Sequence, residues 1–289
     1  MAFYSFEEIE KLCINEKKPL WQVVLEQDAF EQDISVDASL AAMKKVWAAM
    51  KDSIESYDPN MVSKSGLVGG EGGKMAEYAR QENTYCGPFV SAVITRALMM
   101  GCSNACMRRI VAAPTAGACG VLPAVLYSCM EAGSEEEEIL HALYVAAGVG
   151  QVIAQRAYIS GAAGGCQAEI GSASGMAAAA LTALRGGTPA QMGDACAMAL
   201  KNLMGLVCDP VGGLVEVPCV KRNVVGAVNA LSAADMALAG IRSTIPVDQV
   251  IDAMREVGDA MDNRLKETAR GGLAASPKAI SLVENMQLS

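Results

Sequence analysis

Three cysteines stand among glycines and prolines, in surroundings where a thiolate could do chemistry. Cys166 follows Gly164 and Gly165, and Cys208 and Cys219 enclose the turn-rich residues 209–218. Turn residues next to a cysteine expose backbone amides and leave few competing polar groups, which suits the binding of a soft metal centre. Three thiolates on a cuboidal 4Fe–4S cluster would leave one iron open to act as a Lewis acid. The same spacing also fits three buried thiols without a metal.

The remaining cysteines and the single histidine point to structural roles. The chain has ten cysteines and one histidine. Cys102 and Cys106 are four residues apart and could share a helical face, but no second pair lies near them to complete a zinc site. A solitary helical histidine such as His141 is more often structural than catalytic. Three cysteines are expected to be core residues: Cys13, Cys129 and Cys196.

The composition predicts an all-α or nearly all-α fold. Hydrophobic residues make up 52% of the 289 residues while aromatics make up only 4%, which favours helices that touch through small side chains. Only residues 110–113 and 214–217 invite a strand. We expect an N-terminal helical segment over residues 1–60 and one continuous body over residues 61–289, with glycine-rich loops that converge on the cysteine site.

The charge and the hydropathy pattern exclude several classes of partner. A net charge of −9 repels phosphate backbones, so nucleic acid is not an expected partner. The apolar stretch 143–159 carries Gln151, Gln155 and Arg156, so it predicts a buried core helix and no membrane span. The opening residues are polar and acidic, and a chain of this length needs no disulfides. We therefore expect a cytoplasmic protein with reduced cysteines.

Local signals predict several helix boundaries. Ser134 and Glu137 have the spacing of a capping box, and Thr188 with Pro189 marks the start of a helix that reaches about residue 206. An apolar helix over residues 88–100 is expected to break at residues 101–109. Residues 58–74 hold five glycines and two lysines in the run after Ser63. They predict a loop that either holds an anion on its amides or links the N-terminal helices to the body.

Five segments resemble one enzyme family. They are residues 65–70, 112–117, 159–169, 206–219 and 267–274. Together they resemble the alpha subunit of the iron–sulfur-dependent L-serine dehydratases (L-serine ammonia-lyases), in the two-chain form of that family. The resemblance extends over most of the chain, and the long cysteine loop is specific to the family.

The resemblance implies a reaction, a cofactor and a partner. Members of the family convert L-serine to pyruvate and ammonia without pyridoxal phosphate, a step of amino-acid degradation. Their 4Fe–4S cluster is held by three cysteines, which correspond to Cys166, Cys208 and Cys219. A Ser-Ser-Ser-His-Thr motif of the single-chain relatives is absent here, so the chain resembles half of the enzyme and implies a beta subunit. Lys201 and Asn202 stand where many single-chain relatives have a Glu-His pair, which puts a role for that histidine in doubt.

In such an enzyme the serine hydroxyl would bind the open iron and a base would remove the Cα proton. Because His141 is poorly placed for this role, we expect the base on the partner subunit. Polar and glycine-rich positions within or near the matching loops are the candidates for substrate binding: Lys64, Ser65, Gly66, Gly69, Gly70, Asn104 and Thr115.

Other functions remain open at this point. The substrate could be L-threonine, L-cysteine or a hydroxy acid, with the same cluster. The chain could also be a non-catalytic iron–sulfur redox sensor, although sensors usually complete four protein ligands. A helical subunit without a metal is the simplest alternative.

Overall fold

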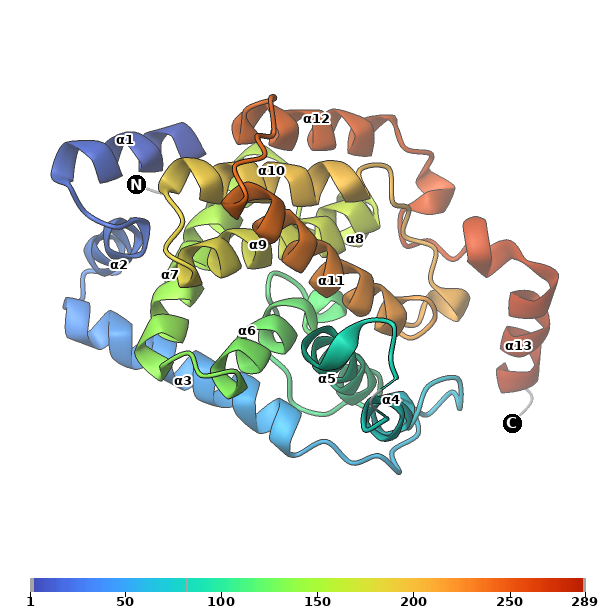
Figure 1. The fold of residues 1–289 in the computed structure, drawn as a ribbon. Coiled ribbons are helices and arrows are strands. Elements are labelled where there is room, and N and C mark those ends of the chain that lie inside the picture. Colours follow the sequence, from blue (N-terminus) through green and yellow to red (C-terminus); the bar gives the residue numbers. More distant parts are fainter. Residues whose placement is uncertain (1–2, 82, 288–289) are drawn as a thin grey trace.

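The computed structural model describes residues 3–81 and 83–287, and within them it is built from helices and irregular loops (Figure 1). No strand forms in this part of the chain, so the prediction of a nearly all-α fold is confirmed. Residues 110–113 and 214–217, which invited a strand, are irregular. Two isolated bridges, Val62 with Gly69 and Cys208 with Lys266, are the extended pairings that the described residues make.

The α-helices follow one another in this order: α1 (Phe6–Glu16), α2 (Leu20–Glu31), α3 (Val36–Glu55), α4 (Glu71–Ala79), α5 (Gly87–Ala105), α6 (Val121–Glu131), α7 (Glu136–Arg156), α8 (Gly161–Gly164), α9 (Ser172–Leu184), α10 (Pro189–Leu203), α11 (Cys219–Leu238), α12 (Val247–Ala260) and α13 (Pro277–Gln287). Short 3₁₀ turns connect them: η1 (Ala116–Ala118), η3 (Val211–Gly213), η4 (Asn263–Leu265) and η5 (Gly272–Ala275). The segment η2 (Gln167–Gly171) is a π-helix that runs directly into α9.

Helix α9 is the centre of the molecule. It packs against α7, α10 and α11, and its residues from Ser172 to Thr182 are all buried. Small side chains make this possible, because Gly175 leaves room for Cys196 of α10 and Gly226 of α11 lies against Ile170. Close-packed helices with alanine and glycine at their contacts are what the composition predicted.

The N-terminal helices pack on this centre. Phe6, Ile9 and Val24 are buried in the same hydrophobic cluster as α7 and α9. Gly148 of α7 faces the Val24 side chain closely, and Gly193 of α10 faces the Phe6 ring. In Figure 1, α1, α2 and α3 run down one side of the molecule and along its lower edge, while α13 lies at the opposite side.

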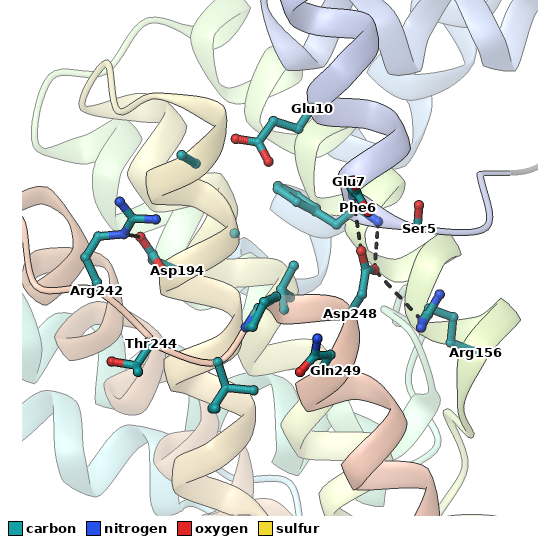
Figure 2. Close-up of a pocket in the computed structure, with 15 residues that line it drawn as sticks. Ser5, Phe6, Glu7, Glu10, Arg156, Asp194, Arg242, Thr244, Asp248 and Gln249 are labelled. Carbon is teal, nitrogen blue, oxygen red and sulfur yellow. Dashed lines mark hydrogen bonds and ion pairs between the residues drawn. The ribbon is translucent and has the colours of Figure 1, made fainter.

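An open cavity of about 770 Å³ lies where α1, α10 and α12 meet (Figure 2). Its lining is strongly charged and includes Glu10, Asp194, Arg242 and Asp248. Arg242 Nε lies 2.6 Å from Asp194 Oδ2, so these two charges form an ion pair. The cavity contains no cysteine.

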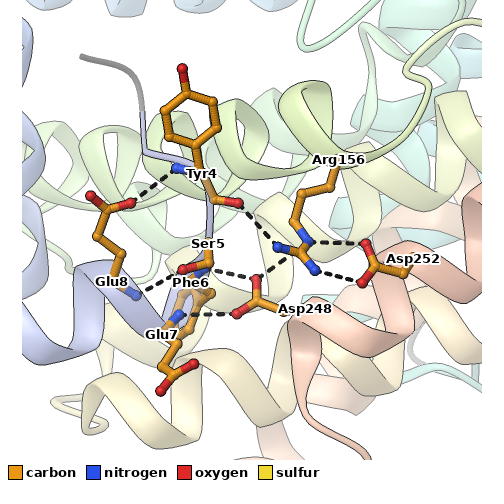
Figure 3. A network of polar contacts seen from close by, with 8 residues as sticks. All are labelled: Tyr4, Ser5, Phe6, Glu7, Glu8, Arg156, Asp248 and Asp252. Carbon is orange, nitrogen blue, oxygen red and sulfur yellow. Dashed lines mark hydrogen bonds and ion pairs between the residues drawn. The ribbon is translucent and has the colours of Figure 1, made fainter.

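One carboxylate beside this cavity holds the first turn of α1 (Figure 3). Asp248 Oδ1 accepts the Phe6 amide at 2.8 Å, and Oδ2 accepts the Glu7 amide at 3.1 Å. Arg156 donates to both oxygens of Asp252 and to the Tyr4 carbonyl. Because the first amides of a helix have no partner within the helix, a carboxylate from α12 satisfies them and favours the local dipole.

Some predicted boundaries are confirmed and others are shifted. Thr188 caps α10 in a capping box with Gln191, and Pro189 is its first residue, as predicted. The capping box of α7 uses Glu135 and Glu138, one residue later than the predicted Ser134 and Glu137. The Glu135 and Glu138 carboxylates accept backbone amides at the start of α7, where the helix dipole favours negative charge.

Two predicted irregular regions are partly helical. Helix α4 begins at Glu71, inside the predicted 58–74 loop, because packing of Gly72 on the backbone of Met99 in α5 outweighs the low helix propensity of glycine. Helix α5 continues past the predicted break to Ala105. Gly101 lies in its interior, where it allows close contact with Val220 of α11.

The apolar stretch 143–159 belongs to α7 as far as Arg156, and most of its residues are buried against α2 and α9. The prediction of a buried core helix for this stretch is therefore confirmed as far as Arg156. In the described part of the chain, no helix combines the length and the apolarity that crossing a bilayer requires.

Candidate active site

The fold brings Cys166, Cys208 and Cys219 together, although 42 residues and more of chain separate Cys166 from the other two. Their exposed fractions are 2%, 2% and 6%. Burial raises the pKa of Cys166 to about 11 and that of Cys219 to about 12. The pKa of Cys208 is raised by burial first, and then by the charges of Cys166, Glu267 and Cys219. This mutual electrostatic influence requires the three sulfurs to be neighbours.

Two of these cysteines begin helices, although the sequence placed all three in loops. Cys166 immediately precedes the π-helix η2, and Cys219 is the first residue of α11. Cys208 lies in the extended link after α10. There its amide donates to the Leu265 carbonyl at 2.8 Å, and its carbonyl accepts the Glu267 amide at 2.7 Å. The correction matters because the first turn of a helix offers free amides and positive potential to a sulfur anion.

Gly161 leaves room for the Cys208 side chain. A Cβ added to this glycine would lie 2.6 Å from Cys208 Sγ, so another residue at this position would displace the sulfur. Gly165, one residue before Cys166, has φ +78°, a conformation that side-chain-bearing residues rarely adopt. Residues 160–165 thus need their glycines for both the turn and the close approach.

We call Cys166, Cys208 and Cys219 together the thiol centre. Arg222 supplies positive charge to it. Its Nη1 donates to the Val207 carbonyl at 2.7 Å and its Nη2 to Asp209 Oδ1 at 2.8 Å. Burial raises the pKa values of Cys166 and Cys219, and the charge of Arg222 acts in the opposite direction on both. A fixed guanidinium beside the sulfurs therefore favours their thiolate forms, which are the forms that bind metal.

Each cysteine segment also carries a carboxylate that holds a neighbouring loop. Glu216, three residues before Cys219, accepts hydrogen bonds from Ser63 Oγ at 2.9 Å and from Ser65 Oγ. Asp209, next to Cys208, accepts the Leu273 amide at 2.7 Å. These contacts hold the glycine-rich loops at residues 63–70 and 271–273 against the segments that contain Cys219 and Cys208.

The third carboxylate is Glu169, three residues after Cys166. Thr115 Oγ1 donates to its Oε1, and the Gly117 amide also donates to the side chain. A Cβ at Gly117 would lie 2.6 Å from Oε1, so glycine lets the carboxylate rest on the backbone. Burial, followed by the charge of Glu267, raises the pKa of Glu169 against the opposing effect of the Thr115 hydroxyl.

The predicted substrate residues fall into three groups. Ser65 and Thr115 contact the cysteine segments through Glu216 and Glu169. Asn104 lies close to the same loop, since its side-chain amide donates to the Ala116 carbonyl at 3.1 Å. The others belong to the loop that Glu216 holds: Lys64 and Gly66 are exposed, the Gly69 amide donates to Glu71, and Gly70 precedes α4.

Three buried cysteines are the type of donor set that an iron–sulfur cluster takes. In residues 3–81 and 83–287, no three Cys, His, Asp or Glu side chains are grouped closely enough to hold one metal ion. A cuboidal cluster takes each thiolate at a different iron, which spaces the sulfurs more widely than a single tetrahedral ion does. The three buried thiols, with Arg222 beside them and a glycine that makes room for Cys208, would supply the thiolate donors of such a cluster.

Five other cysteines and the histidine have different surroundings. Cys13, Cys129 and Cys196 are buried core residues, as predicted. Cys102 is buried and donates to Glu71, while Cys106 follows the end of α5. His141 stacks on Trp21 at a ring separation of 3.6 Å, between α7 and α2.

Five residues of the centre were not found from the sequence as site residues: Asp209, Glu169, Glu216, Arg222 and Glu267. Glu169 and Glu216 each stand three residues from a cysteine, and that spacing was the signal available. Their partners lie far away in the chain, so spacing alone could not reveal the contacts.

Comparison with known proteins shows one family, which matches most of the chain. The family model described as "Serine dehydratase alpha chain" matches residues 15–274. The chain is 49% identical over 252 residues to a probable L-serine dehydratase alpha chain of Bacillus subtilis, covering 87% of this chain and 81% of that one. It is 38% identical over 271 residues to the L-serine dehydratase alpha chain of Peptoniphilus asaccharolyticus, covering 93% of each.

A longer relative aligns over part of its length. L-serine dehydratase 2 of Escherichia coli is 39% identical over 282 residues, which cover 95% of this chain and 55% of that protein. The matches therefore include both chains of about this length and proteins with a further region. The matched residues 15–274 contain all three cysteine segments and every loop that they hold. The chain belongs to the serine dehydratase alpha chain family.

Proposed function

We propose that the chain is the alpha subunit of an enzyme that converts L-serine to pyruvate and ammonia at a 4Fe–4S cluster. In this proposal Cys166, Cys208 and Cys219 hold the cluster. The observation that carries it is the convergence of three buried, mutually coupled thiols from separate segments, in a chain of the serine dehydratase alpha family. The fit of Gly161 against Cys208 Sγ supports the assignment of that sulfur.

The cluster would supply a Lewis-acidic iron for the leaving hydroxyl. The chain itself supplies the surroundings. Arg222 favours the thiolate state of Cys166 and Cys219, and burial of the three sulfurs excludes water from them. The loop at residues 63–70, fixed by Glu216, offers backbone amides and the Lys64 ammonium to the substrate carboxylate, and Asn104 and Thr115 border the opposite loop.

The partner in this proposal is a beta subunit that completes the site. Two relatives are named alpha chains, and the longer relative contains a region beyond the match. His141 is stacked on Trp21 and unsuited to proton transfer at the cysteines, so the base that removes the Cα proton is assigned to the partner. Residues 1–60 serve as a supporting helical segment of the body at residues 61–289.

Anaerobic iron and sulfide analysis tests the cluster. The purified chain is expected to bind about four irons after reconstitution, with the broad visible absorption of a 4Fe–4S cluster. Cys166→Ser, Cys208→Ser and Cys219→Ser should each lower iron content and abolish serine deamination by the two-chain enzyme. Cys196→Ser is the matched control, since Cys196 is equally buried but packs in the core between α9 and α10. Unchanged iron content in all three site variants would refute the assignment.

Two further measurements separate the proposed activity from its alternatives. Product assays with L-serine, L-threonine, L-cysteine and L-glycerate decide the substrate class. Deamination by the alpha chain alone, at the rate of the two-chain enzyme, would contradict the assignment of the base to the partner.

A further inference from the structure

Glu169 is a carboxylate near Cys166, Cys208 and Cys219 that the loop containing Thr115 and Gly117 holds. Its side chain lies on Gly117, accepts the Thr115 hydroxyl and the Gly117 amide, and retains some exposure. It projects from the π-helix η2 between Cys166 and the buried helix α9. An inserted π-turn changes the direction of the following side chains, and such turns are frequent at functional sites.

The charge around Glu169 is predominantly negative. Glu267 acts on it with a like charge, and Glu169 in turn disfavours the thiolates of Cys166, Cys208 and Cys219. The cation that acts on Glu169 is Arg222, but both ends of its guanidinium are bonded to Val207 and Asp209. A buried carboxylate in such a field is stabilised when a small cationic group binds beside it.

We propose that Glu169 binds the α-ammonium group of the substrate and thereby selects 2-amino acids over 2-hydroxy acids. This inference rests on the proposed function. The Lys64 ammonium and the glycine amides are donors that suit a carboxylate, and such donors cannot hold an ammonium group. Glu169 is the complementary group, because it lies three residues from a cysteine and is oriented by the loop that contains Thr115.

The test uses the anaerobically loaded two-chain enzyme and Glu169→Gln, which keeps the shape of the side chain and an oxygen for the Thr115 hydroxyl. Binding of L-serine and of L-glycerate, which carries a hydroxyl in place of the ammonium, is followed by the visible spectrum and by calorimetry. We expect normal iron content and an L-serine dissociation constant raised on the order of 10- to 100-fold. Affinity for L-glycerate should be unchanged or higher. Glu256→Gln, a change of the same charge on the exposed face of α12, is the control.

Each other outcome overturns the assignment. Unchanged L-serine affinity with lost turnover would give Glu169 a role in proton transfer instead. Equal weakening of both ligands, or loss of iron, would make it a support of the Cys166 segment. Thr115→Val provides a second measurement, because it leaves the carboxylate in place without its hydroxyl donor. It should weaken L-serine less than Glu169→Gln does, and it should weaken L-glycerate less than L-serine. Failure of the wild-type enzyme to bind iron or to turn over L-serine would instead refute the proposed function.

Discussion

Asp209 and Asp248 make the same type of contact, a carboxylate that accepts backbone amides, in two different regions of the molecule. Each carboxylate accepts backbone amides from a distant segment, Leu273 in one case and Phe6 with Glu7 in the other. Each has an arginine nearby, but Arg222 Nη2 lies 2.8 Å from Asp209 whereas Arg156 Nε lies 3.9 Å from Asp248. Side-chain exposure is 4% for Asp209 and 15% for Asp248.

The difference in burial shows that a carboxylate bonded to backbone amides can support the thiol centre, as Asp209 does, or can attach the N-terminal helix α1 to the body, as Asp248 does. The Asp209 pair is desolvated, so removing one charge leaves the other buried and unpaired. Asp248 stands beside an open cavity, where water can replace the lost partner (Figure 2). The thiol centre is therefore expected to respond to substitution as a unit, and the N-terminal attachment to respond locally.

Asp209→Ala should have the largest effect. It leaves the Arg222 guanidinium without its carboxylate and the Leu273 amide without its acceptor. We expect a loss of about 3–5 kcal/mol in the free energy of unfolding, measured by urea denaturation. Asp209→Asn retains an acceptor for Leu273 and should lose less. A loss below that of Asp248→Ala would contradict the contrast between the two regions.

An added methyl group can be compared in the two regions: Gly161→Ala places it at the thiol centre, and Gly193→Ala places it against α1. The new Cβ would lie 2.6 Å from Cys208 Sγ in the first case and 2.8 Å from the Phe6 ring in the second. Overpacking costs about 1–3 kcal/mol, and the Gly161 variant should also lose iron after reconstitution. The Gly193 variant should keep its iron. Equal iron content in both would show that Cys208 tolerates displacement.

Asp248→Ala should destabilise the protein by about 1–2 kcal/mol, the usual cost of losing the acceptor at a helix start. Hydrogen exchange should rise in α1 and remain unchanged in the loop at residues 63–70. Faster exchange throughout that loop would show that the two regions are coupled.

The smallest effect concerns His141, on the side of the N-terminal helices. Burial lowers its pKa below 6.5, against the opposing charges of Glu137 and Glu138. The neutral form is thus favoured in the folded state, so its contribution is complete above pH 6.5 and is lost as the pH falls below it. His141→Gln should flatten the loss of stability between pH 7 and 5, measured by thermal denaturation. An unchanged slope would exclude His141 as its source.

The sequence predicted features that depend on neighbours in the chain. Thr188 and Pro189 marked a helix start correctly because a capping box is local. The three cysteines were recognisable because glycine and proline surround them. In contrast, the capping box of α7 lies one residue later than predicted, since Glu135 and Ser134 are both capable of capping.

Features that depend on distant segments could not be read in the same way. The helical state of Gly72 depends on Met99, and the interior position of Gly101 depends on Val220. Likewise, the roles of Glu169 and Glu216 depend on Thr115 and on Ser63 with Ser65. Tertiary packing decides these cases, and a single sequence carries little record of it.

The pairing of Cys208 with residues 265–267 also orders events during biosynthesis. The Cys208 amide and carbonyl find their partners in Leu265 and Glu267, and Asp209 finds its own in Leu273. A ribosome makes these partners after all three cysteines, because they follow Cys219 in the chain. Because domains assemble as their chain emerges, this centre can close only after residues 265–273 have left the ribosome. Until then Cys208 lacks the backbone partners that hold it in place.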